Sequence, residues 1–102
     1  MDKPKIYISG KITGKSRLDV ETDFSRGVLE VVRDGCVPVN PLQNGVPRWM
    51  PWHIHMVVDL IMLLRCDGIL MLRGWENSRG ARIEYRVAEL MEIPINYEDS
   101  IE

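Results

Sequence analysis

The sequence predicts an α/β domain with a small parallel sheet of about four strands, arranged as a flavodoxin-like or Rossmann-like three-layer sandwich. Four short β-rich runs alternate with three helical patterns, and this alternation is typical of a parallel sheet whose crossovers are helices. With 102 residues, the chain is expected to form one domain, residues 1–102. The runs expected to form strands are Lys5–Ser9, Cys36–Val39, Ile69–Leu72 and Pro94–Tyr97.

Helical periodicity predicts the first and third helices. The first is expected over about residues 19–33 and is ended by the pair Asp34-Gly35. The residues expected on its apolar side are Phe24, Val28, Val31 and Val32. The third helix is expected from about residues 78–80 to residue 92. The residues expected in its core stripe are Ile83, Val87, Leu90 and Met91.

The second helix, expected over about residues 51–65, is apolar on nearly all sides. Its apolar residues are Ile54, Val57, Val58, Ile61 and Leu64 on one side, and Met56, Leu60, Met62 and Leu63 on much of the rest. A helix of this kind must be covered twice. The sheet can cover one side, and we expect a second subunit to cover the other, in a homodimer at least.

Charge and composition exclude several partners. The formal net charge is −2 and the two signs are interspersed, so no basic stripe is available to bind a nucleic-acid polymer. The longest apolar stretch, residues 54–64, is interrupted by Asp59 and is too short to cross a membrane. No signal peptide is visible. The two cysteines, Cys36 and Cys66, are expected to be buried thiols of a reducing compartment, and the protein is expected to be cytoplasmic.

Neither a metal nor a cofactor is expected. His53 and His55 alternate, but no third ligand stands at a suitable spacing. The segment 40–52 contains three prolines, one glycine and two tryptophans, so it is expected to be a long ordered loop. Trp49 and Trp52 could stack on a base or could anchor the loop on the core.

Two segments, residues 5–14 and 74–84, lead from strand-like runs through glycines toward helical patterns. Ligands bind at such strand ends in open α/β sheets. The first turn offers backbone N–H groups, two hydroxyls and an ammonium group, which suit a phosphate or sugar hydroxyls. Neither the phosphate-binding loop of nucleoside triphosphatases nor the dinucleotide fingerprint is present. The residues expected to contact a ligand in this turn are Ser9, Gly10, Lys11, Thr13 and Gly14.

Three residues are candidates for catalysis. Glu84 falls at the margin of the apolar stripe, near Gly80, and could be a nucleophile held in a cleft or an ordinary surface charge. Tyr7 lies in a predicted strand and could orient that carboxylate or could be a common strand tyrosine. Asp59 follows His55 by one turn of the second helix, and it could bond to a sugar or base or pair across a subunit interface.

With these residues in view, the chain resembles the nucleoside 2-deoxyribosyltransferase-like superfamily, in particular its small phage and bacterial members. The resemblance covers nearly the whole chain. It implies that Glu84 attacks the anomeric carbon of a 2-deoxyribosyl group, that Tyr7 orients Glu84, and that Asp59 belongs to the same pocket. The matching positions are Lys5–Gly10, Asn40-Pro41, Asp59, Cys66-Asp67 and Ser78–Glu84.

One position departs from the transferases. They carry an Asp six residues before the nucleophile, whereas this chain has Ser78. In this respect it is similar to the deoxynucleoside 5′-monophosphate N-glycosidases of the same superfamily, which implies that Ser78 and the Ser9–Gly14 turn hold a phosphate and that water is the acceptor. Asp59 is then the expected proton donor. The resulting hypothesis is cleavage or transfer at the N-glycosidic bond of a 2-deoxynucleoside or its 5′-monophosphate; the alternative is a nucleotide-binding protein without efficient turnover. The residues expected to bind substrate outside the first turn are Trp52, Ser78 and Gly80.

Overall fold

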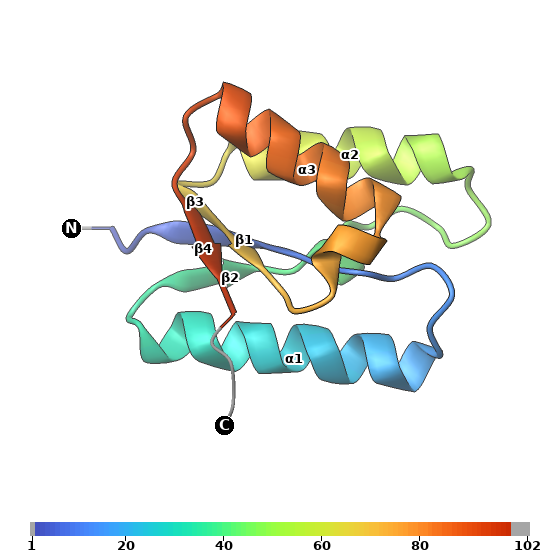
Figure 1. The fold of residues 1–102 in the computed structure, drawn as a ribbon, viewed down its shortest axis with the longest axis horizontal. Helices are drawn as coiled ribbons and strands as arrows, with labels where there is room; N and C mark the ends of the chain where they lie inside the picture. The colour runs from blue at the N-terminus through green and yellow to red at the C-terminus, as the bar shows by residue number, and fades with distance from the viewer. Residues whose placement is uncertain (1, 99–102) are drawn as a thin grey trace.

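The computed structural model describes residues 2–98 and forms three layers, with a four-stranded sheet between helices (Figure 1). All strand pairings are parallel and the strand order is β2-β1-β3-β4. This architecture confirms the predicted fold class. The strands are β1 (Lys5–Ser9), β2 (Val37–Val39), β3 (Gly68–Met71) and β4 (Ile95–Tyr97). The helices are α1 (Arg17–Arg33), α2 (Trp52–Leu64) and α3 (Arg79–Leu90), with 3₁₀ turns η1 (Pro41–Gln43) and η2 (Trp75–Asn77).

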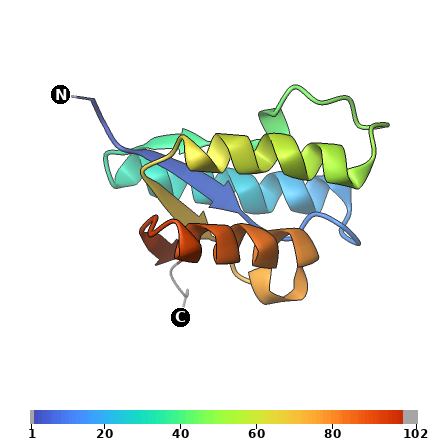
Figure 2. The same cartoon turned by 90° about the horizontal axis from the view of Figure 1, so that it is seen from above.

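One helix covers one face of the sheet and two helices cover the other. Helix α1 lies alone on its face, and α2 and α3 lie side by side on the opposite face (Figures 1 and 2). Because successive side chains of a strand point to opposite faces, Ile8 packs with the α1 layer while Tyr7 packs with the α2 and α3 layer. Ser9 is two residues after Tyr7, so its side chain lies on the same face of the sheet, toward α3. The candidate site described below includes both side chains.

Helix α1 begins at Arg17, two residues before the predicted start, and ends at Arg33 as predicted. The Ser16 hydroxyl caps its first turn by accepting a hydrogen bond from the Asp19 N–H at 3.1 Å. At the other end Gly35 has a φ of 76°, a conformation that glycine adopts without strain. The predicted apolar side was wrong at Val32, which is 54 % exposed. The residues that α1 buries are Val20, Phe24, Gly27 and Val31.

The predicted core stripe of α3 was also wrong in part. Leu90 and Met91 are exposed at 67 % and 59 %, and the helix instead buries Ala81, Glu84 and Ala88. These three residues share one face by their spacing of three and four. The two alanines allow the helix to approach the sheet closely, and the hydrogen bonds of Glu84 to β1 orient this face inward.

Helix α2 buries one face and leaves a second apolar face exposed. Its buried residues are Met56, Asp59 and Leu63, whereas Val57, Ile61 and Leu64 are each about half exposed. Within residues 2–98, no helix combines the length and apolar character that a membrane crossing requires. Both cysteines are unpaired, and they are partly buried rather than fully buried as expected.

A candidate active site at the carboxyl ends of the strands

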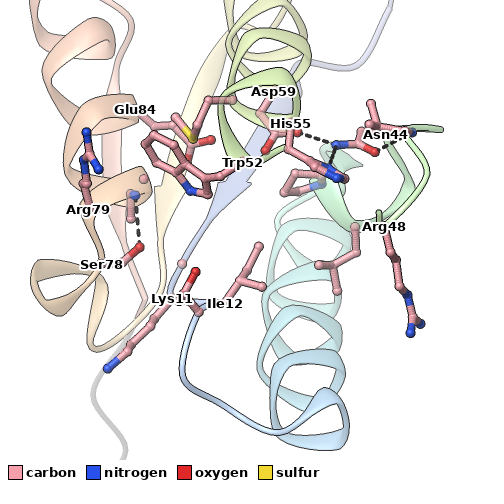
Figure 3. Close-up of a pocket in the computed structure, with 18 of the residues that line it drawn as sticks. Lys11, Ile12, Asn44, Arg48, Trp52, His55, Asp59, Ser78, Arg79 and Glu84 are labelled. Atoms are coloured by element: carbon pink, nitrogen blue, oxygen red, sulfur yellow. Dashed lines mark hydrogen bonds between the residues drawn. The ribbon is translucent and has the colours of Figure 1, made fainter. Parts of the chain in front are cut away.

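A cleft of about 1470 Å³ opens at the carboxyl ends of β1 and β3. Its walls come from the β1–α1 loop, the loop between η1 and α2, and the first turns of α2 and α3. Figure 3 shows Glu84 and Trp52 toward one side of this cleft and Asn44 and Arg48 toward the other. The fold thus gathers segments from all parts of the chain around one space.

Glu84 is the central acidic group of the cleft. It is 5 % exposed and lines the cleft from α3. The Tyr7 hydroxyl donates to its Oε2 at 2.6 Å, and the Ser9 hydroxyl donates to its Oε1 at 2.6 Å. The first of these hydrogen bonds brings Glu84 and Tyr7 together, as the interpretation that Tyr7 orients the carboxylate requires. Tyr7 itself is fully buried and is not among the residues that line the cleft. These two hydrogen bonds fix the carboxyl plane relative to β1, which is the orientation a reacting carboxylate requires.

Burial raises the pKa of Glu84 to about 7. Hydrogen bonds from Ser9 and Tyr7 lower the pKa, while the negative charge of Asp59 raises it. Burial also raises the pKa of Tyr7 well above its usual value of 10.0, and the charge of Glu84 adds to this effect. Tyr7 therefore remains protonated and acts as a donor, and about half of the Glu84 carboxyl groups are ionised near neutral pH.

Asp59 is held by a residue of its own chain. It is 7 % exposed, and its Oδ1 accepts a hydrogen bond from Asn44 Nδ2 at 2.9 Å (Figure 3). Burial raises the pKa of Asp59, although the Asn44 hydrogen bond and the charge of His55 lower it. The two partners considered from the sequence were a ligand and a second subunit. Asn44 belongs to the same chain, so it is neither of these partners. Asp59 also lines the cleft.

Asn44 is a positioning residue that sequence reasoning missed. The same Nδ2 that bonds to Asp59 lies 3.4 Å from His55 Nδ1, and Asn44 Oδ1 accepts from the Val46 N–H at 2.8 Å. His55 Nε2 lies 3.1 Å from the carbonyl of Pro47, and a protonated Nε2 donates to this oxygen. The loop that follows η1 is thereby tied to α2 through two side chains.

Removing the Asn44 amide is expected to raise the pKa of Asp59 further. Asn44→Ala leaves the buried carboxylate without its donor, which disfavours the charged form. A carboxyl-carbon NMR titration of the Asp59 side chain measures the change. Asn96→Ala on the exposed edge strand β4 is the control and should leave this titration where it is. An unchanged or lowered pKa for Asp59 in Asn44→Ala contradicts the assigned role.

Ser78 begins helix α3. Its Oγ accepts a hydrogen bond from the Ala81 N–H at 3.1 Å and so caps the helix. The hydroxyl hydrogen of Ser78 is not needed for this bond and remains available to donate into the cleft. Gly80 lies two residues after Ser78, where an added Cβ would stand 3.2 Å from Met56 Sδ. Its lack of a side chain keeps this part of the cleft open.

The predicted ligand-binding turn divides into two groups. Gly10, Lys11 and Thr13 line the cleft. Ser9 is fully buried and contacts Glu84 instead, and Gly14, with a φ of 85°, belongs to the turn outside the residues that form the lining. The turn therefore supplies both a ligand-facing segment and a partner for the carboxylate.

The two tryptophans of the long loop differ in their environment. Trp52 lines the cleft, and the Arg79 guanidinium lies 4.7 Å from the centre of its ring (Figure 3). Trp49 is 80 % exposed, so the interpretation that it anchors the loop on the core was wrong. Trp52 thus connects the start of α2 to the start of α3 on one wall of the cleft.

Cationic side chains gather in the cleft, and sequence reasoning identified only one of them. The cations in the lining are Lys11, Arg17, Arg48, Arg79 and Arg82. Arg79 could have been found, because it follows directly on a residue expected at a helix start. Arg48 carried no such signal, since its loop has no periodicity. Among residues 2–98, no group of three or more side chains is arranged to hold a metal ion.

The fold and the cleft define a parallel α/β domain with a candidate ligand site at its strand ends. The chain belongs to the family described as Domain of unknown function (DUF4406), which it matches over residues 4–97. No curated protein matches the chain.

Proposed function

We propose that the protein cleaves or transfers at the N-glycosidic bond of a 2-deoxynucleoside or its 5′-monophosphate, with Glu84 as the nucleophile. The observation that carries the proposal is the pair of 2.6 Å hydrogen bonds that hold Glu84 between Tyr7 and Ser9 in the cleft. The sequence resemblance described above supports it and would place the family in the nucleoside 2-deoxyribosyltransferase-like superfamily. The small members of that superfamily occur in phages and bacteria.

In the first step, a Glu84 oxygen forms a bond to C1′ of the sugar as the bond from C1′ to the base nitrogen breaks. The electron pair of that bond leaves with the base, which takes a proton from Asp59. The raised pKa of Asp59 favours the protonated form that this role needs. Tyr7 and Ser9 orient the attacking carboxylate. The product is a sugar ester of Glu84, as in retaining glycosidases.

In the second step, water or a second base attacks C1′ and displaces the Glu84 carboxylate. Asp59, now ionised, takes the proton of the attacking group. The Ser78 hydroxyl, the first turn and the N-terminus of the 12-residue helix α3 are suited to a 5′-phosphate, because N–H groups and the helix dipole favour an anion there.

Product analysis tests the proposal. The protein is incubated with mixed 2-deoxynucleosides and their 5′-monophosphates, with and without an acceptor base, and the products are separated by chromatography. We expect release of free base that depends on the protein. Exchange of bases in the presence of an acceptor identifies transfer, and release into water identifies hydrolysis. Absence of both over hours contradicts the proposal.

A second candidate is a nucleotide-binding protein without efficient turnover. It is favoured by Ser78, whose oxygen accepts from the Ala81 N–H at a position where the transferases carry an acid. Titration calorimetry with the same compounds separates the two candidates. Binding heat without product formation favours the binding protein.

We also propose that the exposed apolar face of α2 forms a homodimer interface. Val57, Ile61 and Leu64 recur at helical spacing and are about half exposed, so a second copy would remove them from water. We expect light scattering to give twice the chain mass at micromolar concentration. Ile61→Glu should give a single chain mass, whereas Leu29→Glu on α1, which is 57 % exposed in the free chain, should not. A single chain mass for the unmodified protein contradicts the interface.

The proposed location is the cytoplasm. Cys36 and Cys66 are unpaired, and unpaired thiols are typical of reducing compartments. Deoxynucleotides, the proposed substrates, are also made and consumed there.

A further inference from the structure

Positive charge is concentrated in the cleft although the protein as a whole is acidic. Within residues 2–98, five of the 13 lysines and arginines line the cleft, but only two of the 13 acidic residues do, Asp59 and Glu84. The rest of this segment therefore carries eight basic and 11 acidic residues. A cleft with the opposite sign to the rest of the molecule concentrates and steers anionic ligands.

The cations stand on two walls. Lys11 and Arg79 lie beside Ser78, at the end of the cleft where a 5′-phosphate is proposed to bind (Figure 3). Arg48 lies on the opposite side, in the loop that leads to α2 (Figure 3). The cleft separates these two walls (Figure 3), so their cations can contact different groups of one ligand.

The cations of the cleft differ in whether they are paired with other residues of the described chain. Arg17 pairs with Glu21 at 2.8 Å, and Arg82 donates to the carbonyl of Glu76 at 2.8 Å. By contrast, Lys11 and Arg48 make no hydrogen bond or ion pair with another residue of the segment 2–98. They are therefore available to a ligand at no cost in internal contacts.

The size of the cleft agrees with a ligand larger than a nucleoside monophosphate. Its volume of about 1470 Å³ exceeds the range of about 300–1,000 Å³ that is usual for small-molecule sites. The cations stand on two sides of this space, so it can hold a second anionic group between them.

We propose that the cleft binds a nucleotide with at least one phosphate beyond the 5′-monophosphate, and that Arg48 contacts this additional phosphate. The nucleoside part of this inference rests on the proposed function. Two ligand classes share the chemistry: a nucleoside 5′-diphosphate or triphosphate, and a dinucleotide whose second phosphate joins two nucleosides. Arginine suits the contact because its planar fork matches phosphate oxygens.

Titration calorimetry tests the inference in a Glu84→Gln background, which prevents consumption of the ligand. The ligands are a deoxynucleoside 5′-monophosphate, the corresponding diphosphate and triphosphate, and a 5′-phosphorylated dinucleotide. We expect at least one ligand with an additional phosphate to bind about tenfold more tightly than the monophosphate. Tighter binding of the diphosphate identifies a terminal phosphate chain, and tighter binding of the dinucleotide identifies the phosphodiester.

Arg48→Met removes the charge while keeping an apolar side chain of similar length. It should weaken binding of the preferred ligand about tenfold and leave monophosphate binding within about twofold. Arg33→Met, at the far end of α1 from the β1–α1 loop, is the matched control and should change neither affinity. Equal affinity for all the ligands, or equal loss for all of them in Arg48→Met, overturns the inference. If the protein with Glu84 intact still releases base from the monophosphate in that case, the proposed function stands. If no nucleotide binds and the protein with Glu84 intact releases no base, both fail.

Discussion

Replacing Glu84 with Gln is expected to lower base release by about 10³-fold or more, because the amide cannot form the sugar ester. Gln keeps the size of the side chain. Its amide oxygen can accept a hydrogen bond from one of the two hydroxyls of Tyr7 and Ser9, and its NH2 group can donate to the oxygen of the other. The loss therefore reports the missing carboxylate and not a collapsed cleft. Chromatography of the released base, with substrate in excess, measures the effect.

Glu89→Gln is the matched control for this prediction. Glu89 lies on the same helix and is exposed, where it pairs with Arg86 at 2.8 Å. It should leave turnover within about twofold, as surface changes usually do. Turnover that survives in Glu84→Gln at the level of the control contradicts the assignment of Glu84 as nucleophile.

The same Glu84→Gln change is expected to stabilise the protein at alkaline pH. The folded-state pKa of Glu84, about 7, is raised from the ordinary value of 4.5 by burial, so the folded state holds its proton more tightly than the unfolded chain. The stability contribution is complete below pH 4.5 and is lost as pH rises through 7. At pH 8 the variant should therefore have a free energy of unfolding about 3 kcal/mol above that of the unmodified protein.

Urea unfolding at several pH values measures this difference. Near pH 4 the two proteins should be about equally stable, because the unmodified Glu84 is then protonated in both states. Subtracting the two curves removes the contribution of Glu98, whose partners are the same in both proteins. If the variant is the less stable protein at pH 8, or if the difference between the two does not change with pH, the buried carboxylate is not titrating as described.

Much of the fold and part of the site followed from simple periodicities. The alternation of short apolar runs and helical patterns predicted the parallel sheet, because parallel strands require crossovers. The period of two in β1 placed Tyr7 on the face opposite Ile8, where α3 now lies. Glu84 stood out because it did not group with the solvated charges of its helix.

Other features depend on contacts between distant segments and left no local signal. The predicted stripe of α3 followed the large apolar side chains, but the helix is positioned by Ala81 and Ala88, which allow close approach. Asn44 acquires its role only when the loop after η1 meets α2. The position of Arg48 across from Ser78 likewise depends on the complete fold.

Glu98 is a further case of a role that the sequence did not indicate. It is 7 % exposed at the end of β4, where it accepts from the Arg73 N–H at 2.9 Å and from Arg26 Nη2 at 3.2 Å. Burial opposes its ionisation, but these hydrogen bonds and charges prevail and lower the pKa of Glu98. A glutamate usually lies in solvent, and only the folded chain brings α1 and the end of β3 to Glu98.

The central claim is that Glu84 carries the sugar during the reaction. Rapid acid quenching of the protein with excess substrate, followed by digestion and peptide mass spectrometry, tests it most directly. The account predicts a mass increase of one 2-deoxyribosyl group, with its 5′-phosphate where the substrate has one, on the peptide that contains Glu84. Sustained base release while that peptide stays unmodified, with the sugar on another residue, would contradict it.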